Sequence, residues 1–139
     1  MSRHGPAKAP CRSCPYRRDV PSGVWAKEEY AKLPGYDGDT GQQLDAGAMG
    51  AFFCHQQSGR LCAGWVGCHD MNESLGLRLA SMHDSISEED VEAAFDYVSP
   101  VPLFDSGAEA AAHGLAQLEE PGEQARRTID RLERKQPRR

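Results

Sequence analysis

The sequence predicts an α+β fold, a small irregular domain centred on a metal site, with one short hairpin and two to three packed helices. The first observation is the segment Cys11-Arg12-Ser13-Cys14, because two thiolates in one tight turn can bind the same metal ion. The second is a group of three more cysteines between residues 54 and 68, which could complete the coordination. The third is the helical spacing of apolar residues in the second half of the chain.

The composition agrees with one small domain that has a thin core. The chain has 139 residues, of which 39% are hydrophobic and 7% aromatic, with 14 Gly and 9 Pro. A chain of this length usually forms a single core, and a metal ion often stabilises a core that burial alone leaves marginal. The predicted organisation is a flexible basic arm over residues 1–10, a metal-centred domain over 11–120, and a basic tail, helical or disordered, over 121–139.

The cysteine count and the first residues predict a cytoplasmic protein. Five cysteines is an odd number, and the first six residues contain no apolar stretch typical of a secretory signal. Reduced thiols in the cytoplasm favour metal ligation over a disulfide framework. No segment approaches the roughly 18 consecutive apolar residues that a membrane span requires, so no membrane partner is expected.

Turn signals separate short elements in the first third of the chain. Residues 21–25 predict a turn, and residues 26–33 predict a short helix. The helix is expected to end at Pro34-Gly35, because proline and glycine both interrupt helical hydrogen bonding. Residues 36–50 are rich in Gly and Asp and predict an irregular loop, with a helical turn near residues 42–44 as an option.

Two apolar runs in the middle of the chain predict the hairpin. Residues 51–54 and 61–66 are short, apolar and bounded by turn residues, as buried strands usually are. Ser58-Gly59 between them favours a turn. Pairing of the two strands would bring Cys54 and Cys62 close together, which suits a shared metal ion.

The second half of the chain predicts amphipathic helices. Apolar residues recur every three to four positions across residues 75–82. Ser87, followed by three acidic residues, favours the start of a helix over residues 88–98, because the acids lie at the positive end of the helix dipole. Ser106 and Glu109 form a capping box for a third helix.

The cysteines predict a metal site with four cysteine ligands. A structural zinc ion prefers four tetrahedral ligands, most often cysteine alone or cysteine with one histidine. The predicted ligands are Cys11, Cys14, Cys54 and Cys62. The reserve ligands are Cys68, His55 and His69. Trp25 and Trp65 lie next to these segments and are expected to cover the site and exclude water.

The residues leave several kinds of cysteine chemistry open. Zinc is slightly favoured as the cofactor, because structural zinc is common at small cysteine sites. An iron–sulfur cluster is the alternative, since Pro15 directly follows a cysteine, as in ferredoxin-type motifs. A thioredoxin-type dithiol is less favoured, because no strand precedes the pair. A metal-dependent hydrolase would use the ligand types present in His69-Asp70 and His83-Asp84.

The two ends of the chain are basic, whereas the body between them is acidic. Residues 1–18 carry five basic residues and no acidic one, although the whole chain has a formal net charge of −5. Basic ends can contact nucleic acid or an acidic partner, but an acidic body repels phosphate. A protein partner is therefore expected, with nucleic acid as a further candidate at the ends. The candidate nucleic-acid contacts are Arg126, Arg127, Arg131, Arg134 and Lys135.

Three cysteine segments resemble a family of small uncharacterised proteins of actinobacteria and their phages, classed as a domain of unknown function. They are Cys11-Arg12-Ser13-Cys14-Pro15, Phe53-Cys54-His55-Gln56 and Cys62-Ala63-Gly64-Trp65. This resemblance covers about residues 11–82 and implies a shared site without a known activity. The chain is less closely similar to the WhiB-like iron–sulfur regulators, which pair a Cys-x-x-Cys-Pro segment with a later Gly-Val-Trp turn, here residues 23–25.

Together these observations favour a non-enzymatic metal-binding module with a protein-interaction or regulatory role. The first alternative is a redox-responsive iron–sulfur transcriptional regulator, in which the state of the cluster changes the fold. The second alternative is a small metal-dependent hydrolase. An enzyme is the less favoured class, because the histidines and aspartates lie in turn-rich segments rather than on long packed helices.

Overall fold

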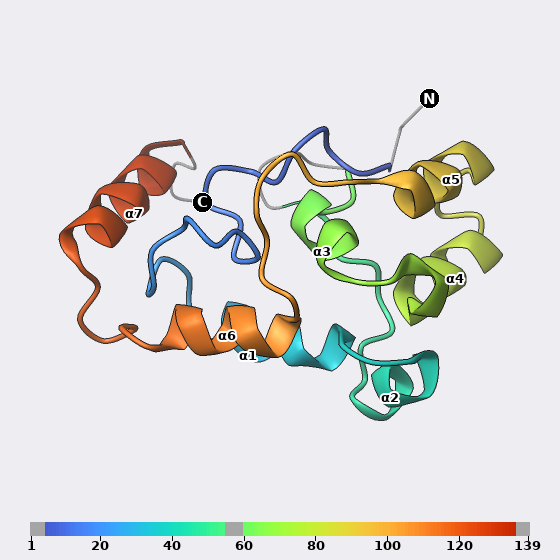
Figure 1. Cartoon of the computed structure of the whole chain (residues 1–139), viewed down its shortest axis with the longest axis horizontal. Coiled ribbons are helices and arrows are strands. Elements are labelled where there is room, and N and C mark those ends of the chain that lie inside the picture. Colours follow the sequence, from blue (N-terminus) through green and yellow to red (C-terminus); the bar gives the residue numbers. More distant parts are fainter. Residues whose placement is uncertain (1–4, 55–59, 136–139) are drawn as a thin grey trace.

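The computed structural model describes residues 5–54 and 60–135, and regular structure within these ranges is helical. Short α-helices and two 3₁₀ helices, η1 and η2, follow one another along the chain (Figure 1). In chain order they are α1 (Lys27–Ala31), η1 (Leu33–Tyr36), α2 (Thr40–Asp45), α3 (Ala63–Cys68), η2 (Met71–Glu73), α4 (Leu75–Met82), α5 (Glu88–Asp96), α6 (Gly107–Leu115) and α7 (Glu123–Lys135). None of the helices described here has the length and apolar character needed to cross a membrane.

The predicted α+β class and its hairpin are wrong, because the described residues contain no strand and no sheet. Phe53 and Leu61 form only an isolated antiparallel bridge. Two residues of pairing provide too few hydrogen bonds and cross-strand contacts for a stable sheet. Most of the segment 61–66, predicted as a strand, belongs to α3, which begins directly after Cys62.

The segment before the first cysteine pair lies against this bridge. The Leu61 N–H donates a hydrogen bond to the Gly5 carbonyl oxygen (3.1 Å), and the Ala7 N–H donates to the Leu61 carbonyl oxygen (3.3 Å). Leu61 is fully buried, and Ala7 is 1% exposed. The described part of the predicted arm is thus attached to the segment that carries Cys62.

The core is formed by aromatic and aliphatic side chains around Trp65 on α3. Trp65 is 1% exposed and contacts Tyr36 edge-on, with 5.9 Å between ring centroids. Phe52 contacts Tyr36 in the same way at 5.6 Å and Tyr16 at 6.0 Å. Edge-to-face ring pairs add about 0.5–1.5 kcal/mol to the stabilisation from burial alone. The central contacts of the fold are therefore largely aromatic.

A second packed layer joins α1, η1 and α6, which lie side by side (Figure 1). Two glycines of α6 allow this close approach. A Cβ atom at Gly107 would overlap the Leu33 carbonyl, and one at Gly114 would overlap the ring of Tyr30. Tyr30 is 2% exposed, so its ring has little room to move away.

A smaller apolar cluster attaches α7 to the segment that follows the first cysteine pair. Its buried members are Val20, Val24, Ala125 and Leu132, with Trp25 and Ile129 packed against them. Figure 1 shows α7 at the end of the molecule opposite α4 and α5. Trp25 also packs against the main core and so connects the two clusters.

Candidate metal centre

Hydrogen bonds hold the first cysteine pair in consecutive turns. The Cys14 N–H donates to the Cys11 carbonyl oxygen (3.0 Å), and the Arg17 N–H donates to the Cys14 carbonyl oxygen (3.1 Å). The indole N–H of Trp25 donates to the carbonyl oxygen of Ser13, between the two cysteines, at 2.7 Å. These bonds fix the backbone of the turn, so both thiols are presented from one short segment.

The second pair is positioned by the isolated bridge. The Cys62 N–H donates to the Phe52 carbonyl oxygen (2.8 Å), and the Cys54 N–H donates to the Arg60 carbonyl oxygen (2.8 Å). Cys62 is also the N-cap residue of α3. The backbone around Cys54 and Cys62 is therefore fixed even though no hairpin forms in the described residues.

The structure brings the four thiols predicted as ligands together. The Cys14 and Cys62 sulfur atoms are 3.9 Å apart. The Cys11 thiol lies close enough to Cys14 and Cys54 for both to lower its pKa. Cys14 and Cys62 are thus in contact, and Cys11 lies near both Cys14 and Cys54. Cys14 is fully buried and Cys54 and Cys62 are at most 8% exposed, whereas Cys11 is partly exposed.

These contacts divide the thiols by how readily each loses its proton. Hydrogen bonds with Cys14 and Cys54 lower the pKa of Cys11. The hydrogen bond with Cys14, helped by the backbone N–H groups of Trp65 and Gly64, lowers the pKa of Cys62. The hydrogen bonds that Cys14 makes with Cys11 and Cys62, and then its burial, raise the pKa of Cys14. Cys14 therefore loses its proton less readily than Cys11 and Cys62.

The prediction of a fold centred on a metal site is wrong. No three or more Cys, His, Asp or Glu side chains in residues 5–54 and 60–135 form a ready-made metal site. Among the four thiols, Cys14 and Cys62 are in contact at 3.9 Å, and Cys11 lies near Cys14 and Cys54. Their proximity is a fact of the structure, whereas ion binding would require the side chains to reorient.

Gly64, which sequence analysis did not single out, allows α3 to approach the first cysteine pair. A Cβ atom at this position would overlap the Cys14 sulfur and would lie 2.9 Å from the Cβ atom of Tyr16. In the sequence, the indication of this close approach is a glycine two positions after Cys62. A glycine alone does not show which residue packs against it. Only the tertiary contact shows why a side chain is excluded.

Two of the reserve ligands lie at a different site. The His69 Nδ1 is 2.9 Å from the Trp65 carbonyl oxygen, and Nε2 is 2.8 Å from the Asp37 carboxylate. Both ring nitrogens thus already have partners. Cys68 lines a cavity of about 290 Å³ together with His69 and Asp37, and burial raises its pKa to about 12. The third reserve ligand, His55, lies outside the described residues.

Asp37, directly after η1, connects the end of α3 to the start of α6 at this cavity. Besides its contact with His69, its carboxylate accepts hydrogen bonds from the N–H groups of Gly107 (2.7 Å) and Ala108 (2.9 Å) in the first turn of α6. Negative charge at this end of a helix is favourable, because the free N–H groups and the helix dipole both attract it. Asp37 therefore fixes α6 and His69 in place.

We expect Asp37→Ala to lower the free energy of unfolding by about 2–3 kcal/mol, because hydrogen bonds to charged groups are each worth about 1.5–3 kcal/mol. Urea denaturation followed by circular dichroism measures the change. Asp105→Ala is the matched control, since that side chain is 86% exposed and pairs with Arg18 at 3.4 Å. Its expected effect is within about 0.5 kcal/mol. Equal effects of the two changes would contradict the role given to Asp37.

The remaining predicted residues have the following positions. Trp25 holds the first cysteine turn through its bond to Ser13, and Trp65 is buried on α3. The basic residues predicted for nucleic-acid contact all belong to α7. Arg126, Arg127 and Arg134 are exposed, and Arg127 pairs with Glu123 at 2.6 Å. No interaction described here joins these residues to the thiols.

A model described as a family of unknown function (DUF6283) matches residues 6–133, which include all five cysteines. No curated protein and no solved structure matches the chain. The family match confirms the expected likeness to an uncharacterised family. Because the match includes nearly every residue of the chain, the protein belongs to the family of unknown function DUF6283.

Proposed function

We propose that the protein is a small metal-binding module in which Cys11, Cys14, Cys54 and Cys62 bind one zinc ion. Its role in this proposal is non-enzymatic and consists of protein interaction or regulation. The supporting observation is the 3.9 Å separation of the Cys14 and Cys62 sulfur atoms. Four thiolates placed about 2.3 Å from a tetrahedral zinc ion are about 3.8 Å from one another. Rotation of the thiols toward a common centre would satisfy this geometry.

The charge around the thiols supports the proposal. Four thiolates and one divalent cation leave a net charge of −2, which is costly in a buried place unless positive charge lies nearby. The Arg17 guanidinium donates to the Pro10 carbonyl oxygen at 3.2 Å, beside the first cysteine pair. Attraction to Cys14 and Cys11 contributes to raising the pKa of Arg17, after the larger effect of Asp19.

The close packing of the sulfur atoms favours one ion over a cluster. An iron–sulfur cluster places several iron and sulfide atoms between its cysteine ligands, so the thiols cannot remain in contact. The likeness to WhiB-like regulators supports the cluster, but the distance between Cys14 and Cys62 supports zinc. The burial of the thiols also favours a structural ion, because catalytic zinc keeps one position open to substrate.

The proposal predicts one zinc ion per chain in protein purified without oxygen. Native mass spectrometry and elemental analysis measure the stoichiometry, and a visible absorption spectrum is recorded on the same sample. We expect a colourless protein whose melting temperature falls when a chelator removes the metal, because binding to the folded state stabilises it. A brown protein that contains iron would show that the cofactor is an iron–sulfur cluster and not zinc. Metal-free protein with an unchanged melting temperature would overturn the proposal.

A further inference from the structure

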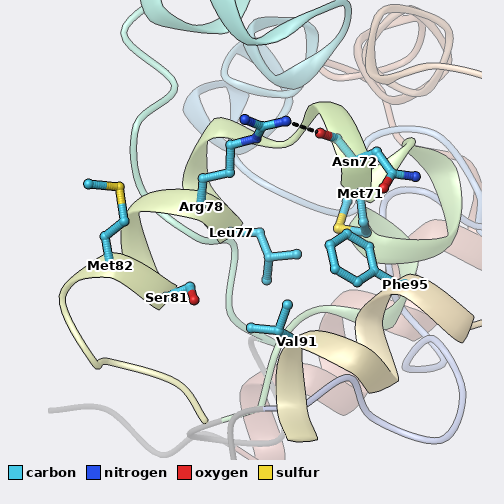
Figure 2. Close-up of a pocket in the computed structure, with 8 residues that line it drawn as sticks. All are labelled: Met71, Asn72, Leu77, Arg78, Ser81, Met82, Val91 and Phe95. Carbon is cyan, nitrogen blue, oxygen red and sulfur yellow. Dashed lines mark hydrogen bonds between the residues drawn. The ribbon is translucent and has the colours of Figure 1, made fainter. Parts of the chain in front are cut away.

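An open apolar groove lies between α4 and α5 (Figure 2). These two helices lie at the end of the molecule opposite α7 (Figure 1). Its volume is about 410 Å³. Figure 2 shows Leu77 of α4 facing Val91 and Phe95 of α5, with Met71 beside the ring of Phe95. Leu77 and Met71 are buried at 1% and 5% exposure and form the floor.

The walls of this groove expose large apolar side chains to solvent. Phe95 is 48% exposed, and Met82, at the end of α4, is 75% exposed. A single exposed apolar residue is ordinary, but two beside one concave apolar surface favour an interaction site. Methionine is common on surfaces that bind helices, because its flexible side chain adapts to different apolar partners.

The α5 wall of the groove is bordered by negative charge. Glu88 and Glu92 each precede a groove residue, Val91 and Phe95 respectively, by three positions, so they lie beside them on the helix surface. Both are exposed, and neither forms an ion pair with any described residue. Unpaired carboxylates along an apolar surface attract a partner that carries basic residues beside its apolar ones.

The α4 wall carries a basic residue, but its side chain is already held. The Arg78 guanidinium donates to the Asn72 carbonyl oxygen at 2.6 Å, as Figure 2 shows. The positive charge thus lies at the η2 end of α4, and the negative charge lies along α5. This difference between the two walls would orient a charged partner, with its basic side toward α5.

We propose that the groove binds an amphipathic helix of a partner protein, with its apolar side in the groove and its lysine or arginine residues facing Glu88 and Glu92. This inference rests on the interaction role proposed above and does not require the metal. An open groove between two helices fits apolar anchors spaced at i, i+3 or i+4, and i+7 on a third helix. The chain's own basic helix is not the occupant, because α7 uses its apolar side to contact Val20 and Val24.

The test uses the full chain and synthetic helical peptides of about five turns (~18 residues). One peptide has leucines at the anchor spacing and lysines beside them, and a second has glutamates in place of the lysines. A third has the lysine peptide's composition with the leucines dispersed around the helix. Fluorescence anisotropy measures binding to the wild type, to Phe95→Glu, and to Val98→Glu. Val98 is 83% exposed on the segment after α5 and does not line the groove, so it is the matched control.

We expect only the amphipathic lysine peptide to bind, and we expect Phe95→Glu to weaken it about tenfold or more, as loss of an interface anchor does. The double change Glu88→Lys and Glu92→Lys should reverse the preference toward the glutamate peptide. Circular dichroism and zinc content are measured on every variant. A variant that keeps its helical signal and its zinc but loses peptide binding is defective in the groove and not in the metal site. Equal binding of all three peptides, no binding to the wild type, or self-association that Phe95→Glu abolishes would each overturn the inference.

Discussion

Replacing Cys14 by serine is expected to abolish stoichiometric zinc binding. It should also lower the free energy of unfolding by more than about 4 kcal/mol, because loss of a bound metal is among the most destabilising effects of a single substitution. Cys14 is the largest contributor because its thiol is fully buried and contacts both Cys11 and Cys62. A serine hydroxyl is a poor zinc ligand at neutral pH, so the site would keep only three thiolates. Native mass spectrometry measures the metal content, and urea denaturation measures the stability.

Cys68→Ser is the matched control for this prediction. Its thiol lies in the cavity beside His69 and outside the chain of contacts that joins the other four cysteines. We expect the Cys68 variant to keep one zinc per chain and most of its stability. Both proteins are also denatured with a chelator present. The stability difference between wild type and Cys14→Ser should then shrink to the cost of a buried hydroxyl, about 1–3 kcal/mol. Full zinc occupancy in Cys14→Ser would contradict the proposed ligand set.

The helices of the second half could be predicted closely from the sequence because their signals are local. The repeat over residues 75–82 corresponds to α4, and Ser87 caps α5, where its side chain accepts the N–H of Asp90. Ser106 caps α6 in the same way. Capping and apolar spacing depend on residues a few positions apart, so the sequence contains all the information that they need.

The centre of the chain could not be predicted, because its conformation depends on tertiary contacts. A short apolar run does not distinguish a strand from a buried helix, and this is why the pattern of residues 61–66 wrongly predicts a strand. In the structure α3 begins after Cys62, and its first two residues, Ala63 and Gly64, are small and buried. The same segment carries Cys62, one of the candidate ligands. The position of α3 therefore accounts both for the wrong fold class and for the proximity of the thiols.

The proximity of the four thiols depends on contacts that spacing alone does not contain. Spacing indicates that residues 11–14 could bind one ion and that Cys54 and Cys62 could complete the set. It does not indicate how α3 reaches Cys14, and it cannot separate Cys68 from Cys62. The structure separates them, because Cys62 precedes α3 and Cys68 is its last residue, about one and two-thirds turns further along the helix.

Gly64→Ala is expected to destabilise the protein by about 1–3 kcal/mol, the usual cost of forcing an extra carbon into a packed core. The new Cβ atom would overlap the Cys14 sulfur and press on the Cβ atom of Tyr16. A Cβ atom cannot rotate away, so α3 itself would have to shift. Because this shift separates Cys14 from Cys62, zinc affinity should also fall, by about tenfold for each 1.4 kcal/mol lost. Urea denaturation and competition with a chelating dye measure the two effects.

The sign of this change is informative because helix propensity predicts the opposite. Alanine in a helix is favoured over glycine by about 0.5–1 kcal/mol, so an unconstrained Gly64→Ala would stabilise the chain. Gly41→Ala is the matched control, since Gly41 is likewise the second residue of a six-residue helix, and its nearest neighbour across space is the Asp39 carboxylate at 3.4 Å. Gly41→Ala should therefore be neutral or stabilising and should keep zinc. If both alanines stabilise the protein equally, α3 does not pack on Cys14, and the four thiols have no common position from which to bind an ion.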